Sequence, residues 1–292
     1  MRFYALPSSP GQGKLQYMKR RQFPDFRVFT VIGGLLISLL FAAVPSLAAA
    51  EPDQLAVSAF NSYVGTVESR LALQHRSQQG FLSPVASEQQ SQIRLRRGEL
   101  IVEQIASSTG ATFPGAMLHH WRGTAFAPGA KAADFERLMK DFNAYPQRFS
   151  PQVLKASVLS QQGDRFQAVM RVRQKHVITV VMDTAYDIAF LRLDAQHGYS
   201  IARSTRISEI GAAGTRAELV LTASEEHGFL WRLNTYWSYE ERDGGLYMQI
   251  ESVSLTRSIP TSFAWLIRPF VESVPRESLE FTLCSVCNAL RK

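Results

Sequence analysis

Residues 229–257 contain the feature that most restricts the fold: two alternating segments joined by a tight turn. Asp243-Gly244-Gly245 separates the segments, and Asp-Gly or Gly-Gly is a strong signal for a two-residue β-turn, because both central residues need positive φ. Within each segment, polar side chains alternate with apolar or small ones. The chain is therefore expected to contain an antiparallel sheet in which one face is buried.

Further patterned segments surround this hairpin. Alternation predicts additional strands over 99–105, 117–126, 153–161, 165–175, 177–193 and 199–210. Helical spacing of apolar residues predicts helices over 53–74, 132–142 and 261–271, and a further helix that Pro275 starts or kinks. Helices that are separate from a large antiparallel sheet indicate an α+β fold.

Residues 19–50 have the pattern of a bacterial-type export signal. Cations at 19–21 precede an uncharged apolar run at 28–44, and small residues follow at 48–50, where a signal peptidase cuts. We therefore expect residues 1–50 to be a signal peptide, with Met18 as an alternative start, and the mature protein to be periplasmic or secreted. An uncleaved membrane anchor is the other interpretation. The adjacent arginines leave Sec and twin-arginine export both open.

The net charge of +7 belongs mainly to this leader. Residues 1–50 hold six of the 32 basic residues and one of the 25 acidic residues, which leaves 26 and 24 and a net charge of +2. A domain with so little excess charge has no overall basic field for a phosphate backbone, so nucleic-acid binding is not expected.

The order of the predicted elements resembles the START-like, or SRPBCC, helix-grip superfamily over about 117–290. The matching landmarks are the strand that ends at Pro128-Gly129, the short helix that ends at 143–146, the paired strands after Pro151, the last hairpin and the 261–290 helical segment. The resemblance implies a curved antiparallel sheet wrapped around a long C-terminal helix, with a cavity between them. Its members include lipid carriers, hormone-binding proteins and polyketide cyclases, so the fold alone does not choose a function.

We therefore divide the chain into a signal peptide (1–50), a helical prefix with a first strand (51–115) and a helix-grip domain (116–292). The prefix lies outside the resemblance.

One face of the last hairpin provides the candidate ligand site. Its side chains are bulky and apolar near the turn, and small and hydroxyl-bearing farther from it, which suits the lining of an apolar cavity. The candidate ligand-binding residues are Met170, Trp231, Leu233, Thr235, Trp237, Tyr239, Met248, Ile250, Ser252, Ser254, Trp265 and Phe270. The alternative is that aromatic residues of the C-terminal helix fill this space. The opposite face carries Arg232, Asn234, Ser238, Glu240, Gln249 and Glu251 and is expected to be exposed to water.

The sequence carries no catalytic or metal-binding motif that we would assign, and no cofactor is predicted. His119 and His120 are neighbours on a predicted strand, so their side chains point to opposite faces and cannot share one metal. Cys284 and Cys287 form a C-x-x-C late in a predicted helix, where no helix dipole lowers the thiol pKa. A structural pair is therefore predicted rather than a redox site.

These observations favour an exported, non-catalytic protein that binds or carries an apolar small molecule or lipid. A cyclase-like enzyme is the first alternative, with Tyr186 or Tyr239 assisting proton transfer. An interaction module that uses the 53–74 helix to hold a partner is the second. Residues 265–270, apolar with one cation, allow transient membrane contact. The oligomeric state is not predicted.

Overall fold

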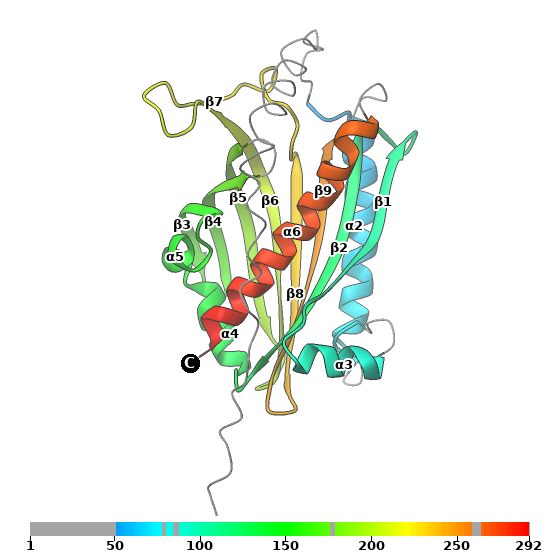
Figure 1. Cartoon of the computed structure of the whole chain (residues 1–292), viewed down its shortest axis with the longest axis vertical. Helices are drawn as coiled ribbons and strands as arrows, with labels where there is room; N and C mark the ends of the chain where they lie inside the picture. The colour runs from blue at the N-terminus through cyan, green and yellow to red at the C-terminus, as the bar shows by residue number, and fades with distance from the viewer. Residues whose placement is uncertain (1–50, 78–79, 84–87, 176–178, 259–263, 292) are drawn as a thin grey trace, which may run out of the picture. The chain divides into compact units, whose positions relative to one another are not determined.

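In the part of the chain that the structure describes, nine antiparallel strands form the centre of the fold (Figure 1). The strand order is β1-β2-β9-β8-β6-β5-β4-β3, and β7 pairs with β6. The computed structural model describes residues 51–77, 80–83, 88–175, 179–258 and 264–291, with the backbone alone for 88 and 264–272. The predicted export signal lies outside these residues. The strands are β1 (Ile101–Gly110), β2 (Phe113–Pro128), β3 (Val153–Gln162), β4 (Arg165–Lys175), β5 (Thr179–Arg192), β6 (His197–Gly211), β7 (Leu219–Val220), β8 (Arg232–Arg242) and β9 (Gly245–Arg257).

The predicted hairpin is the β8–β9 pair. Arg242 pairs with Gly245, so Asp243 and Gly244 are the two turn residues, with φ of 56° and 76°. These are the positive values that a two-residue turn of this kind requires. The register places Thr235 opposite Ser252 and Tyr239 opposite Met248.

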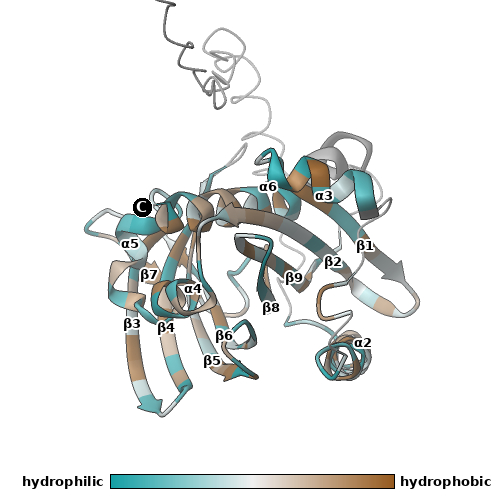
Figure 2. Cartoon of the chain, turned by 90° about the horizontal axis from the view of Figure 1, so that it is seen from below, coloured by the Kyte–Doolittle hydropathy of each residue, from teal (hydrophilic) through white to brown (hydrophobic). Residues whose placement is uncertain are grey.

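Helices cover both faces of the sheet (Figures 1 and 2). The helices are α2 (Gln54–Gln74), α3 (Glu88–Arg96), α4 (Ala132–Lys140), the 3-10 turn η1 (Phe142–Ala144), α5 (Tyr145–Arg148) and α6 (Ala264–Leu290). We call the face that packs against α4 and α6 the inner face, and the face that packs against α2 the outer face. The two helices predicted at the C-terminus are one helix, because α6 continues through Pro275 without interruption.

The inner core lies between the sheet, α4 and the second half of α6. Leu283 is fully buried there, and a β-carbon at Gly123 would lie 2.6 Å from Leu283 Cδ1. A larger residue at position 123 would therefore require the Leu283 side chain to shift. Phe135 of α4 packs at a ring-centroid distance of 4.8 Å from Tyr239.

The outer core is made by α2. Asp53 caps this helix by accepting a hydrogen bond from the Leu55 backbone nitrogen (2.7 Å). Its apolar stripe packs on the sheet and consists of Ala56, Phe60, Val64, Val67 and Leu71. The helix predicted over 53–74 is therefore confirmed. The prediction of a water-exposed outer face is wrong at four of its six positions, because Asn234, Ser238, Gln249 and Glu251 are buried.

The structure confirms the predicted α+β class and the helix-grip arrangement, a curved antiparallel sheet gripping a long C-terminal helix. Strand β1 pairs along β2, and α2 packs on the same sheet, so the 51–115 segment is part of the unit that contains the rest of the sheet. In the described part of the chain, no helix is long and apolar enough to span a membrane.

Candidate functional site

The inner face of β8 and β9 is divided into two parts. The part near the turn, which we call the lower inner wall, consists of Trp237, Tyr239, Met248 and Ile250, and these side chains are at most 4% exposed. They pack with Phe135 and Leu283 in the inner core. The aromatic and aliphatic half of the predicted site is therefore filled core.

The part farther from the turn, the upper inner wall, is less completely covered. It consists of Trp121, Leu233, Thr235, Ser252 and Ser254, which are brought together by the pairing of β2, β9 and β8. Leu233, Thr235 and Ser252 keep partial access to water, although they lie on central strands beneath α6. The side chains of the first part of α6, 264–272, lie outside the described residues, so the described side chains alone do not cover these positions.

One polar group of the upper inner wall is buried without a partner. Within the described part of the chain, the Trp121 Nε1 atom has no acceptor. Among the described residues, no hydrogen bond joins the hydroxyls of Thr235, Ser252 or Ser254 to another side chain or backbone group. Nearby, the hydroxyl of Ser204 is engaged, because it accepts a hydrogen bond from the Leu233 nitrogen (2.9 Å). Buried polar groups are normally hydrogen-bonded, so the Trp121 nitrogen needs an explanation, whereas Thr235 and Ser252 keep partial access to water.

Tyr239, a residue of the cyclase-like alternative, is engaged at the base of the lower inner wall. Its hydroxyl donates a hydrogen bond to Glu136 Oε1 (2.6 Å), and the same carboxylate oxygen accepts a hydrogen bond from Arg192 Nε (2.8 Å). Burial, followed by the bond to Glu136, raises the pKa of Tyr239. Burial alone would raise the pKa of Glu136, but hydrogen bonds from Arg192 and Tyr239 outweigh it and lower that pKa. Burial also raises the pKa of Tyr186, the other candidate, to about 12.

The outer face holds a different polar cluster beneath α2. The Glu251 carboxylate, 2% exposed, accepts hydrogen bonds from His120 Nε2 (2.9 Å), from Arg122 Nε (3.0 Å) and from Arg70 of α2. Tyr63 of α2 bonds to the other ring nitrogen of His120 (2.9 Å). Burial alone would raise the pKa of Glu251, but the His120 hydrogen bond and the two arginine charges lower it to about 2.

The two adjacent histidines lie on opposite faces, as predicted. His120 is in the outer cluster, whereas His119 Nε2 lies 3.3 Å from the Thr256 hydroxyl. The described residues contain no group of three or more His, Cys, Asp or Glu side chains that could hold a metal ion.

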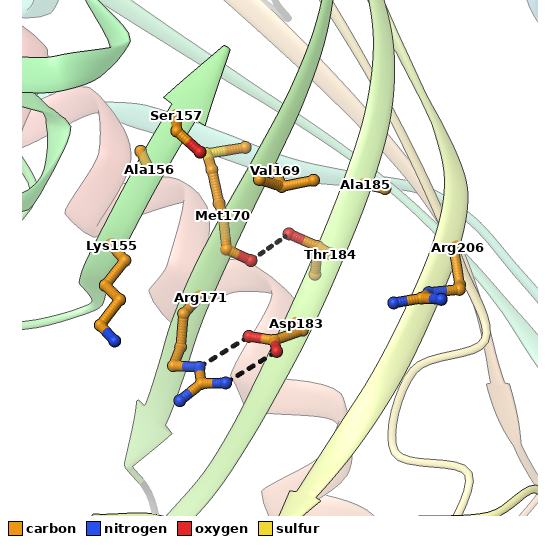
Figure 3. Close-up of a pocket in the computed structure, with 10 residues that line it drawn as sticks. All are labelled: Lys155, Ala156, Ser157, Val169, Met170, Arg171, Asp183, Thr184, Ala185 and Arg206. Carbon is orange, nitrogen blue, oxygen red and sulfur yellow. Dashed lines mark hydrogen bonds and ion pairs between the residues drawn. The ribbon is translucent and has the colours of Figure 1, made fainter. Parts of the chain in front are cut away.

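A separate open pocket of about 300 Å³ lies on the sheet surface at β3–β6 (Figure 3). Two of its four charged side chains form an ion pair: Arg171 binds Asp183 through two contacts (2.7 and 2.8 Å), and Arg171 also binds Glu218 outside the pocket lining. Lys155 and Arg206 complete its charged lining. We interpret this pocket as a surface ion-pair ladder.

The structure places the predicted ligand residues in several surroundings. Trp231 was expected on the inner face, but it packs in the outer core with Tyr236 and Leu255, so this expectation is wrong. The reason is that β8 begins at Arg232, and strict alternation does not extend beyond the strand. Met170 packs at the edge of the inner core and also lines the surface pocket. The side chains of Trp265 and Phe270 lie outside the described residues.

Trp121 was not predicted as a site residue. The signal that could have found it is its parity on the strand predicted over 117–126. Trp121 shares the inner face with Gly123 and Ala125, and its partner on β9 is the predicted residue Ser252.

The two cysteines are free. Cys287 is buried in the inner core and Cys284 is exposed. Burial raises the pKa of Cys287 to about 11 and also raises that of Cys284, which is the opposite of what an activated thiol needs.

No family model matches the chain. No curated protein sequence matches it either. Solved structures with a similar backbone include a STAR-related lipid transfer protein from Xanthomonas axonopodis, with 18% identity, TM-score 0.39, and 64% of this chain and 98% of that one covered. A START superfamily protein from Mycobacterium smegmatis has 14% identity, TM-score 0.39, and coverage of 59% and 96%. The Zhui aromatase/cyclase from Streptomyces sp. R1128 has 14% identity, TM-score 0.41, and coverage of 59% and 92%. These similarities are too distant to assign a function to this chain.

Proposed function

We propose that this protein is an exported, non-catalytic binding or carrier protein for an apolar small molecule or lipid. The ligand is held between the upper inner wall and α6. The observation that carries the proposal is the partial access to water of Leu233, Thr235 and Ser252 on central strands that a helix crosses. A filled core would bury these positions as completely as it buries Trp237 and Met248.

The energetics of such binding follow from apolar burial. A ligand that buries roughly 300 Å² of apolar surface gains about 7 kcal/mol at 25 cal/mol per Å², before the entropic costs of association. The hydroxyls of Thr235, Ser252 and Ser254 then orient a polar group of the ligand, as the few polar groups of an apolar pocket commonly do.

Export is the second part of the proposal. It is supported by the basic segment at 19–21, the apolar run at 28–44 and the small residues at 48–50. The anchored form, in which the leader is retained, would place the same binding domain at the membrane surface.

The test is to express the full precursor, purify the exported protein and record native mass spectra, followed by organic extraction. We expect a reproducible extra mass that extracts as an apolar compound. A mass equal to that of the protein alone, together with no binding of any lipid from a panel, would refute the proposal.

A space-filling variant shows where the ligand binds. Ser252→Leu should reduce ligand occupancy at least tenfold, because the added side chain occupies the proposed space. Ser160→Leu, the same substitution at an exposed position of β3, is the matched control and should leave occupancy unchanged. Equal occupancy in both variants would mean that the ligand lies elsewhere.

A further inference from the structure

The Trp121 indole is the least satisfied polar group of the upper inner wall. The residue is 9% exposed, and its Nε1 atom is buried with no acceptor among the residues that the structure describes. Indole nitrogen can donate a hydrogen bond but cannot accept one. Whatever satisfies this nitrogen must therefore present an acceptor.

The neighbouring hydroxyls extend the same site. Trp121 pairs with Ser252 of β9, and Ser252 pairs with Thr235 of β8, so the indole and two hydroxyls form one row across three strands. Ser254 lies two residues farther along β9 and on the same face. These hydroxyls can donate or accept, and together with the indole they suit an oxygen that accepts more than one hydrogen bond.

Three cations of the neighbouring strands are engaged elsewhere. Arg122 binds Glu251 on the outer face (3.0 Å), and Arg203 binds Glu68 of α2 (2.7 Å). Arg192 binds Glu136 below the lower inner wall (2.8 Å). A carboxylate or phosphate placed against Trp121 would lose its hydration without gaining any of these three counter-charges, which is costly.

We propose that the upper inner wall selects an uncharged apolar ligand that presents a carbonyl or ether oxygen, such as that of a ketone or ester, to the indole N–H of Trp121. This inference rests on the proposed function and names the chemical class of its ligand. The nitrogen is covered by protein atoms, so the ligand reaches it by displacing some of them.

The experiment compares three ligands of similar size: 2-undecanone, undecane and decanoate. Binding to the exported protein is measured by calorimetry or by displacement of a fluorescent apolar probe. The wild-type protein should bind the ketone about tenfold more tightly than the hydrocarbon, the gain expected for one hydrogen bond made by a desolvated donor. It should bind the ketone more tightly than decanoate as well.

The variants separate the indole N–H from the ring. Trp121→Phe keeps an aromatic side chain but has no donor, so it should bind ketone and hydrocarbon with nearly equal affinity. Trp231→Phe makes the same change in the outer core and should keep the tenfold preference. A spectroscopic readout is independent of affinity. The chain has four tryptophans, and the indole proton signal that Trp121→Phe removes should move downfield when the ketone, but not the hydrocarbon, is added to wild type.

Two failures are distinguishable. If wild type binds none of the three ligands, nor any lipid of the wider panel, the proposed function itself is wrong. If it binds them but shows no preference for the ketone over the hydrocarbon, or prefers decanoate, the carrier proposal stands and the inference about Trp121 is overturned.

Discussion

The two faces of β2, β8 and β9 are built from alternate residues of the same strands, yet they are completed in different ways. On the outer face, α2 supplies an apolar stripe and two polar side chains, Tyr63 and Arg70, which complete the hydrogen bonding around His120 and Glu251. On the inner face, the upper wall keeps an unpartnered indole N–H at Trp121 and partly accessible hydroxyls.

This difference separates stability from recognition within one sheet. A buried polar group that has its partners fixes one arrangement of the elements around it, whereas a buried group without partners leaves free energy for a ligand to recover. The outer face therefore has the properties of a structural interface, and the upper inner wall is the surface where we propose that the ligand binds.

The largest expected effect is on stability and comes from truncation in the outer core. Phe60→Ala should reduce the free energy of unfolding by about 3–5 kcal/mol, because Phe60 is 2% exposed and its removal leaves a cavity under α2. Leu233→Ala, in the partly accessible upper inner wall, should cost less than about 2 kcal/mol. Urea unfolding of both variants measures the contrast, and equal losses would mean that the upper inner wall is packed core.

The second effect tests the polar part of the outer face. Glu251→Gln removes the carboxylate charge shared by His120, Arg122 and Arg70, and should cost about 3 kcal/mol, the lower end of the range for breaking a buried ion pair. Glu240→Gln is the matched control. Because Glu240 is partly accessible to water, this substitution should reduce the free energy of unfolding by less than about 1 kcal/mol.

Acid titration of the same pair of proteins shows whether the charge is responsible. The pKa of Glu251 is lowered from 4.5 to about 2, so its contribution to stability is complete above pH 4.5 and is lost as the pH falls toward 2. The difference in unfolding free energy between wild type and Glu251→Gln should therefore shrink across this window. A constant difference would attribute the effect to packing.

The sequence could predict which residues share a face, but it could not predict what covers that face. Alternation correctly separated Trp237 and Tyr239 from Ser238. The interpretation of Gln249 and Glu251 as water-exposed failed because their partners, Ser83 and Arg70, are more than 160 residues away in the chain. Hydrogen bonds between residues so far apart in the sequence cannot be predicted from the local alternation of polar and apolar residues.

The boundary between filled core and open space was likewise only partly predictable. The change from bulky to small side chains along β8 and β9 predicts less complete filling away from the turn, and Leu233, Thr235 and Ser252 do keep partial access to water, whereas Ser254 is buried. It did not show that Trp237 and Tyr239 are core residues, since this depends on Phe135 and Leu283 arriving from α4 and α6. The 53–74 helix shows the same limit: the interaction-module hypothesis uses this helix to hold a partner, and its apolar stripe packs on the protein's own sheet.

The smallest expected effect sharpens the account of how α2 is held. Arg203 and Glu68 of α2 form a two-contact ion pair (2.7 Å each), but the side chains are 48% and 25% exposed. Water screens such pairs, so a double-mutant cycle with Arg203→Gln and Glu68→Gln should give a coupling free energy below about 1 kcal/mol. Glu68→Gln alone should cost more than Arg203→Gln alone, because Glu68 also accepts a hydrogen bond from Tyr236 (3.1 Å). A coupling free energy above about 2 kcal/mol would show that the exposed Arg203–Glu68 pair holds α2 on the sheet as strongly as the buried cluster around Glu251 does. The attachment of α2 could then no longer be explained by the outer core alone.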